Sequence, residues 1–191
     1  ARRQRQMCIR DSLFMSIAEQ MGVRLQQTAR SVNIKERLDF SCAVFDSNGD
    51  LIANAPHTPV HLGSMDRSVA SVIQAHPKMH KGDVFVTNAP YNGGTHLPDI
   101  TVITPVFHKD EAKPVFFVAS RGHHADVGGT APGSMTPLAT HIEDEGVILE
   151  NLKLVSNGKF LHLEIFETLT QNKYPCRNPD QNIADLKAQI A

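Results

Sequence analysis

The stretch of sequence that decides the fold lies between Asn88 and Gly129. It reads NAPYNGGTHLPD at residues 88–99 and RGHHADVGG at residues 121–129. Between these polar clusters lie two runs rich in Val, Ile and Phe, ITVITPVFH and PVFFVAS. Runs of this composition, bounded by glycine and polar residues, are typical of β-strands. We therefore predict a β-hairpin whose outer ends carry the two polar clusters.

The two polar clusters contain residue types that bind metal ions. The hairpin would place His96 and Asp99 beside His123 and Asp126, which predicts a metal or catalytic site. Taken alone, each cluster is also explained by a surface turn with local hydrogen bonds. Adjacent histidines point in different directions, so one of His123 and His124 would be the ligand. The other would bind substrate, transfer protons or support the ligand. Asp126 would either ligate the ion or orient a histidine.

A third polar loop precedes these clusters. His61, in PHTPVHLGSM at residues 56–65, would add an imidazole or a substrate contact, or would be structural. The chain has no nucleophile-elbow serine, Walker phosphate loop or GxGxxG motif. An enzyme site built from these residues would therefore rely on metal-assisted hydrolysis or electrophilic activation of a carbonyl group.

Patterns along the rest of the chain predict an α+β fold. We expect a mostly antiparallel sheet with hairpins, flanked by N-terminal and C-terminal helices. The Asn-Gly pairs at 48–49 and 157–158 are the preferred residues of two-residue type I′ hairpin turns. Apolar periodicity and hairpin signals predict helices at 4–30, 64–76, 162–172 and 178–191, a hairpin of strands 40–46 and 51–55, and a second hairpin within 151–162.

Length and composition indicate a single partial domain. We expect a helical lead-in at 1–38, a β-rich core with the site at 39–163, and a truncated helical end at 164–191. The 191 residues open on Ala1 and stop within a helical pattern that has no cap, which suggests a fragment. A net charge of −1 argues against nucleic acid and anionic membranes as partners. Three scattered cysteines predict reduced thiols in a cytoplasmic protein.

Several linked motifs resemble the hydantoinase B/5-oxoprolinase family. They are ERLDFSCAVFDSNGDLIANAPHTPVHLGSM, GDVFVTNAPYNGGTHLPDITVITPVF, RGHHADVGGTAPGSM and EDEG. The resemblance extends from about Arg5 to the end of the chain. One departure is Ala89, where the family often has a carboxylate.

The resemblance implies a part in the ATP-dependent opening of a cyclic amide, such as 5-oxo-L-proline to L-glutamate or an N-methylhydantoin. ATP would bind to a hydantoinase A-type partner subunit or domain that this chain lacks. The implied ligands of a divalent metal are His96, Asp99 and His123, with His124 as the alternative to His123 and Asp126 as a weaker candidate. Mixed histidine and carboxylate ligands suit Mn²⁺ or Zn²⁺ better than Mg²⁺.

We therefore expect a hydrolase fragment that acts on a small molecule within an oligomer and is inactive alone. His124 and Asp126 would assist proton transfer, and His61 would contribute to catalysis. Two alternatives stay open. The chain would belong to a carboxylase-type subunit that acts on ketones with ATP and bicarbonate, or it would be a non-catalytic module that docks the ATP-binding subunit.

Overall fold

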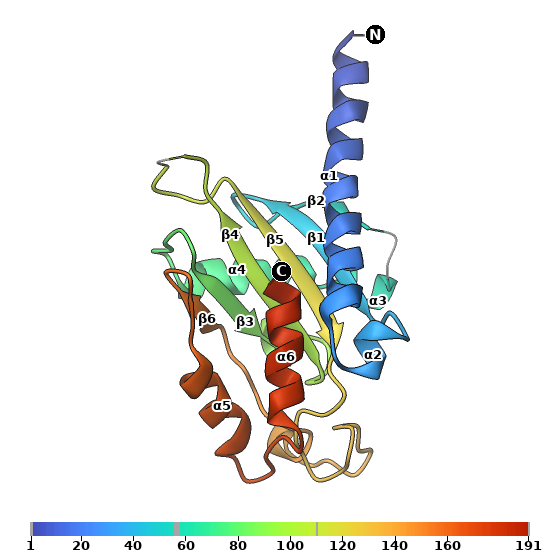
Figure 1. Cartoon of the computed structure of the whole chain (residues 1–191), viewed down its shortest axis with the longest axis vertical. Helices are drawn as coiled ribbons and strands as arrows, with labels where there is room; N and C mark the ends of the chain where they lie inside the picture. Colours follow the sequence, from blue (N-terminus) through green and yellow to red (C-terminus); the bar gives the residue numbers. More distant parts are fainter. Residues whose placement is uncertain (1, 56–57, 110, 191) are drawn as a thin grey trace.

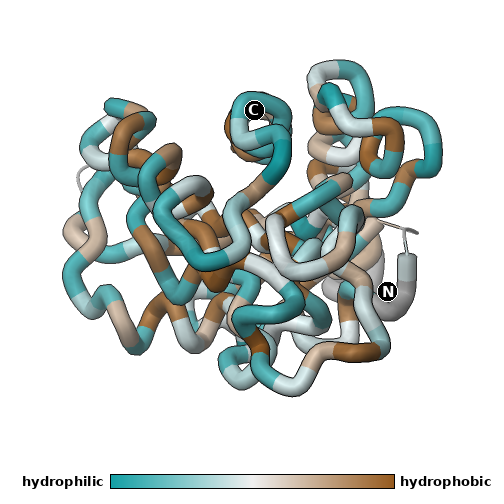
Figure 2. Tube along the Cα trace, turned by 90° about the horizontal axis from the view of Figure 1, so that it is seen from below, coloured by the Kyte–Doolittle hydropathy of each residue, from teal (hydrophilic) through white to brown (hydrophobic). Residues whose placement is uncertain are grey.

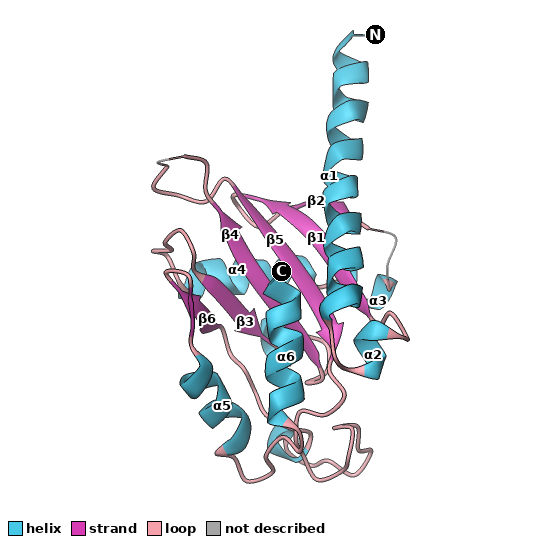
Figure 3. Cartoon of the chain, viewed as in Figure 1, coloured by secondary structure: helices cyan, strands magenta, loops and turns pink. Residues whose placement is uncertain are grey.

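A computed structural model describes residues 2–55, 58–109 and 111–190. Figure 3 shows where the helices, strands and connecting loops lie in the chain. In chain order the elements are α1 (Arg2–Thr28), α2 (Val32–Lys35), β1 (Phe40–Asp46), β2 (Leu51–Asn54), α3 (Pro59–Leu62), α4 (Met65–Ala75), β3 (Val84–Thr87), the 3₁₀ helix η1 (Pro90–Asn92), β4 (Asp99–Val106), β5 (Phe116–His123), the 3₁₀ helix η2 (Ile142–Asp144), β6 (Leu152–Ser156), β7 (Lys159–Phe160), α5 (His162–Thr170) and α6 (Pro179–Ile190).

The strands form one seven-stranded antiparallel sheet in the order β2-β1-β5-β4-β3-β6-β7. This sheet and the helices at both ends of the chain confirm the predicted fold class. The central hairpin is also confirmed, because β4 pairs with β5 from Asp99 opposite His123 to Val106 opposite Phe116. β5 extends further than the sequence indicated, so His123 is the last residue of a strand and not part of a loop.

Helices cover both faces of the sheet (Figure 1). One face packs against α4, and the opposite face packs against α1, α5 and α6. The core on the α4 face includes Phe45, Phe85, Ile103 and Phe117. The core on the other face forms two clusters, one with α5 and α6 and one with the C-terminal part of α1. Hydropathy changes repeatedly along single elements, as expected when one side of each is buried (Figure 2).

The two Asn-Gly turns differ in backbone conformation. Asn157 and Gly158 have φ values of 48° and 82°, as a type I′ turn requires at both central residues. In the β1–β2 hairpin only Gly49 has a positive φ, of 92°, so the predicted type I′ turn is wrong there. The side chain of Asp46 explains the difference, since its Oδ1 accepts hydrogen bonds from the backbone N–H groups of Asn48 and Asp50. These bonds favour a turn built around the aspartate.

The loop that carries His61 contains a short helix that the sequence did not predict. Residues Pro59–Leu62 form α3, which lies against β1 and leads directly into α4. Proline at the first position favours such a helical turn, because its missing N–H would be unpaired there in any case. The consequence is that His61 is held over the sheet and is only 2% exposed.

Candidate metal centre

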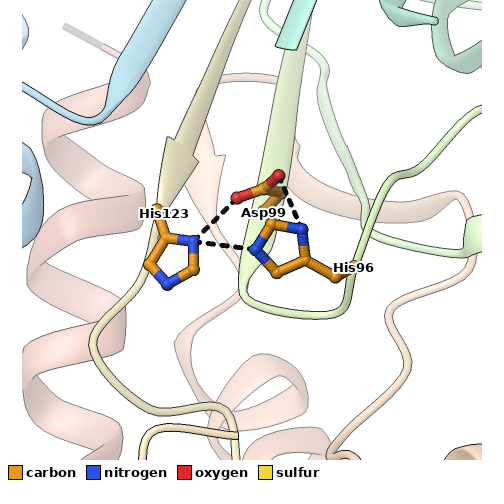
Figure 4. Close-up of side chains that lie close together, drawn as sticks. All are labelled: His96, Asp99 and His123. Carbon is orange, nitrogen blue, oxygen red and sulfur yellow. Dashed lines mark hydrogen bonds and ion pairs between the residues drawn. The ribbon is translucent and has the colours of Figure 1, made fainter. Parts of the chain in front are cut away.

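The central hairpin and the loop before it bring His96, Asp99 and His123 together (Figure 4). Asp99 begins β4 and lies opposite His123 at the end of β5, so both side chains project on the same face of the sheet. The Nδ1 atom of His123 is 2.9 Å from Oδ1 of Asp99 and 3.0 Å from Nε2 of His96. The Nδ1 atom of His96 is 3.1 Å from Oδ2 of Asp99.

A tight turn sets the position of His96. Gly93 has a φ of +89° and lies against the backbone of α4, where a Cβ atom would be 2.4 Å from the Ser68 nitrogen. The turn then leads to Thr95, whose hydroxyl donates a hydrogen bond to Oδ2 of Asp99. The positive φ and the close approach to α4 therefore both require glycine at position 93.

Burial and hydrogen bonding fix the charges of these groups. Burial alone would raise the pKa of Asp99, but hydrogen bonding by His123, His61 and Thr95 outweighs it and lowers the pKa far below its usual range. Burial lowers the pKa of His96, although the charge of Asp99 opposes this shift. At neutral pH the cluster therefore offers an ionised carboxylate and a neutral imidazole, the forms that bind metal ions.

His61 lies beside the same cluster, as the sequence suggested. Its Nε2 atom is 3.6 Å from Oδ2 of Asp99 and 3.5 Å from Oδ1 of Asp39. Its Nδ1 atom is 3.5 Å from the hydroxyl of Ser41, which itself donates to the backbone oxygen of Thr58. The side of the imidazole that carries Nε2 thus faces two carboxylates.

Asp39 is a member of the site that sequence reasoning missed. It directly precedes β1, and its backbone oxygen accepts a hydrogen bond of 2.9 Å from the N–H of His123. This contact exists because β1 pairs with β5, a long-range pairing that local patterns do not reveal. The only available signal was its position in the motif ERLDF, directly before a predicted strand.

His124 is turned away from the cluster toward α6. It is fully buried, its Nε2 lies 2.9 Å from Oε1 of Gln189, and its Nδ1 lies 3.2 Å from the side-chain nitrogen of Asn182. The amide of Gln189 donates to the backbone oxygens of Ile100 and Ser120, so its Oε1 is the acceptor for the imidazole. Both ring nitrogens of His124 therefore attach the last helix to the sheet.

Asp126 is also engaged outside the cluster. Its carboxylate accepts hydrogen bonds from the backbone N–H groups of Gly128 and Gly133 and forms an ion pair of 2.7 Å with Arg177. Burial acts to raise the pKa of Asp126, but these hydrogen bonds lower it overall. The structure thus brings His61 to the three candidate ligands and does not bring His124 or Asp126 there.

The donor set suits a divalent ion. One ligand atom from each of His96, Asp99 and His123 can be chosen so that all three lie within 4.8 Å of one another. Two imidazoles and a carboxylate are the donors typical of Zn²⁺ and Mn²⁺ sites. His96 is 37% exposed, which leaves the cluster open on one side.

Comparison with known proteins identifies the family. The model of the hydantoinase B/oxoprolinase family matches residues 4–191. The chain belongs to this family. The family that the sequence motifs indicated is thereby confirmed.

Three proteins to which this chain is similar are much longer. The chain is 52% identical to 5-oxoprolinase 1 of Arabidopsis thaliana over 97% of its own length, but it spans only 15% of that protein. It superimposes on the ATP-dependent caprolactamase from Pseudomonas jessenii with a TM-score of 0.79 and 30% identity, covering 92% of this chain and 29% of the other. Acetone carboxylase shares the fold, with a TM-score of 0.76, 20% identity, and coverage of 93% and 24%.

In the part of this chain that the structure describes, no helix combines the length and the apolar character that a membrane crossing requires.

Proposed function

We propose that this chain supplies the divalent-metal centre of an ATP-dependent enzyme that opens a cyclic amide, with 5-oxo-L-proline as the substrate and L-glutamate as the product. The observation that carries the proposal is the convergence of His96, Asp99 and His123 at the open end of one hairpin. The identity of 52% to a 5-oxoprolinase and the likeness to a caprolactamase support a cyclic amide as the substrate class.

The residues of the chain prepare the site for this chemistry. A divalent ion bound there would supply positive charge to polarise an amide carbonyl or to acidify a water molecule. Asp99 stays ionised because Thr95 and His123 hydrogen-bond to its carboxylate. His96 stays neutral because it is partly buried, and its exposed edge leaves room for a small molecule. His61 lies next to Asp99 and can exchange a proton or hold a ligand in place.

The use of ATP would depend on a region outside this chain. The caprolactamase to which the chain is similar is ATP-dependent, and the chain covers 29% of that protein. We therefore infer that a hydantoinase A-type subunit or domain binds ATP and that this chain presents the activated amide to water. The intact assembly would be active, whereas the 191-residue chain alone would not.

Metal analysis of the intact protein tests the proposal. We expect His96→Ala and His123→Ala each to remove one equivalent of bound Mn²⁺ or Zn²⁺, measured by elemental analysis after dialysis. His108→Ala is a matched control, because His108 lies at the other end of the same hairpin, 61% exposed and 3.5 Å from Glu111. Unchanged metal content in the His96 and His123 variants would contradict the assignment of the ligands.

Substrate assays separate the hydrolase from the two alternatives. A 5-oxoprolinase releases glutamate from 5-oxoproline with ATP and without bicarbonate, whereas a carboxylase requires bicarbonate and a ketone. The high identity to a 5-oxoprolinase favours the first result, since the likeness to acetone carboxylase concerns the fold. A stable, metal-free protein that still binds its ATP-binding partner would instead support a non-catalytic assembly module.

A further inference from the structure

Arg121 is a charged residue buried directly behind the candidate metal centre. It lies on β5 two residues before His123, so both side chains project on the same face of the sheet. Its exposed fraction is 0%, and it is the largest fully buried side chain in the described part of the chain. The next pair along this face, Ala119 and Ile103, belongs to the apolar core under α4. Arg121 therefore separates the metal-ligand types from the core.

All five N–H groups of the guanidinium have acceptors. Nε donates to the hydroxyl of Thr101 over 2.7 Å. Nη1 donates to the backbone oxygen of His61 over 3.0 Å and to the hydroxyl of Ser64 over 3.1 Å. Nη2 donates to the hydroxyl of Ser68 over 2.8 Å and to the backbone oxygen of Gly93 over 2.9 Å. These five acceptors are neutral oxygens, so the pattern is that of a hydrogen-bonding hub and not of an ion pair.

The acceptors belong to the segments that carry the site. Thr101 follows Asp99 on β4, and the backbone oxygen of His61 belongs to the residue that faces Asp99. Gly93 begins the tight turn that leads to His96. One side chain on β5, close to His123, therefore hydrogen-bonds to the strand of one candidate ligand, to the loop of another and to the backbone of His61.

We propose that Arg121 is a positioning residue for the metal centre, and that its guanidinium fixes the Gly93–His96 turn and His61 relative to Asp99. The inference rests on the proposed function and adds a residue to it. Placing a charge in the interior is costly, because its hydration is lost. Removal of a residue that orients metal ligands typically weakens metal binding about 10- to 100-fold.

Electrostatics and positioning predict opposite effects on metal affinity. A buried positive charge near Asp99 repels a cation, so its removal by charge alone would strengthen metal binding. If Arg121 positions the ligands, its removal weakens metal binding in spite of the relieved repulsion. Variants that keep the positive charge but lose hydrogen bonds therefore decide between the two roles: a purely electrostatic role predicts unchanged metal affinity, and a positioning role predicts weaker binding.

The experiment measures Mn²⁺ affinity in the intact, metal-depleted protein. Electron paramagnetic resonance reports free Mn²⁺ during a titration, and a protein carrying both His96→Ala and His123→Ala provides the background from other sites. The test variants are Arg121→Lys, which keeps the charge but has fewer donors, and Thr101→Val, which removes one acceptor and keeps the arginine. If Arg121→Lys does not fold, the positioning role is still tested by Thr101→Val.

Two controls separate positioning from a general loss of stability. Ser120→Ala removes a buried hydroxyl from β5 on the opposite face, where it donates to the backbone oxygen of Gln189. Val72→Ala removes volume from a fully buried core residue of α4 that is not among the acceptors of Arg121, and so destabilises the fold without removing a hydrogen bond of the hub. All affinities are measured at a temperature where circular dichroism shows each variant to be folded.

We expect Arg121→Lys to weaken Mn²⁺ binding at least about 10-fold, and Thr101→Val to weaken it in the same direction. Ser120→Ala and Val72→Ala should bind like the wild type. Wild-type affinity in both hub variants, tighter binding in either, or an equal loss in Val72→Ala would overturn the positioning role while leaving the metal centre intact. Failure of the wild type to exceed the background would instead overturn the proposed function.

Discussion

The close approach of Gly93 to α4 leads to a quantitative prediction. In Gly93→Ala the new Cβ would lie 2.4 Å from the Ser68 nitrogen and 2.7 Å from two Arg67 atoms. Ordinary contacts begin near about 3.4 Å, so the turn must retreat by roughly 1 Å. A left-handed φ of +89° adds about 1–2 kcal/mol. Misalignment of the hydrogen bond from Arg121 adds about 1–3 kcal/mol. We expect a loss of unfolding free energy of about 3 kcal/mol.

Gly158→Ala is the matched control for this substitution. Gly158 has a φ of +82°, but a Cβ there would have no neighbour within 4 Å. It therefore carries the conformational cost alone, about 1–2 kcal/mol. Urea denaturation followed by circular dichroism would compare the two variants with the wild type. If Gly93→Ala loses no more stability than Gly158→Ala, the turn does not approach α4 as described and the steric reasoning is refuted.

Three further predictions concern the thiols, the acid stability and the role of His124. Cys8 is exposed, whereas burial raises the pKa of the thiols of Cys42 and Cys176 to about 12. Iodoacetamide should therefore label Cys8 alone in the native protein, and mass spectrometry would detect any second label. Burial acts to raise the pKa of Asp83, but hydrogen bonds, including one from Lys153, lower it overall. Its stabilising effect is therefore present above the unfolded pKa and is lost as the pH falls through the lower folded pKa. Asp83→Asn should therefore cost stability at about pH 7 and progressively less as the pH falls below about 4 in urea titrations. His124→Ala should lower the unfolding free energy by about 3 kcal/mol, because Oε1 of Gln189 loses its partner and the side-chain nitrogen of Asn182 keeps only its bond to the backbone oxygen of Asp126. The variant should keep Mn²⁺ affinity, and loss of Mn²⁺ with unchanged stability would contradict this structural role.

The sequence predicted the candidate site where the interactions are local. Asp99 and His123 belong to one hairpin and His96 to the loop before it, and the strand composition and bounding glycines are visible without any long-range information. Adjacent residues of an extended chain point in opposite directions, so only one of His123 and His124 was expected to be a ligand. Local patterns could not show which of the two histidines points toward the site, because that depends on where α4 and α6 pack.

Long-range pairing accounts for what the sequence did not reveal. Asp39 joins the site because β1 pairs with β5, although the two strands are separated by most of the β-rich core. Arg121 appeared in the sequence as one more polar residue in a glycine-bearing stretch. Its role depends on acceptors from α4, β4 and the Gly93 turn, and no pattern near Arg121 indicates them.

Because β4 pairs with β5 without interruption, the strand register determines which side chains reach the site. Side chains alternate between faces, so a slip of a single residue would send Asp99 toward α6 and bring Ile100 to the place of the carboxylate. The chemistry of the centre is therefore encoded as much in hydrophobic strand positions far from it as in the histidines. A sequence change that shifts the pairing near Val106 and Phe116 would move the candidate ligands at the other end of the hairpin apart, although none of them is itself changed.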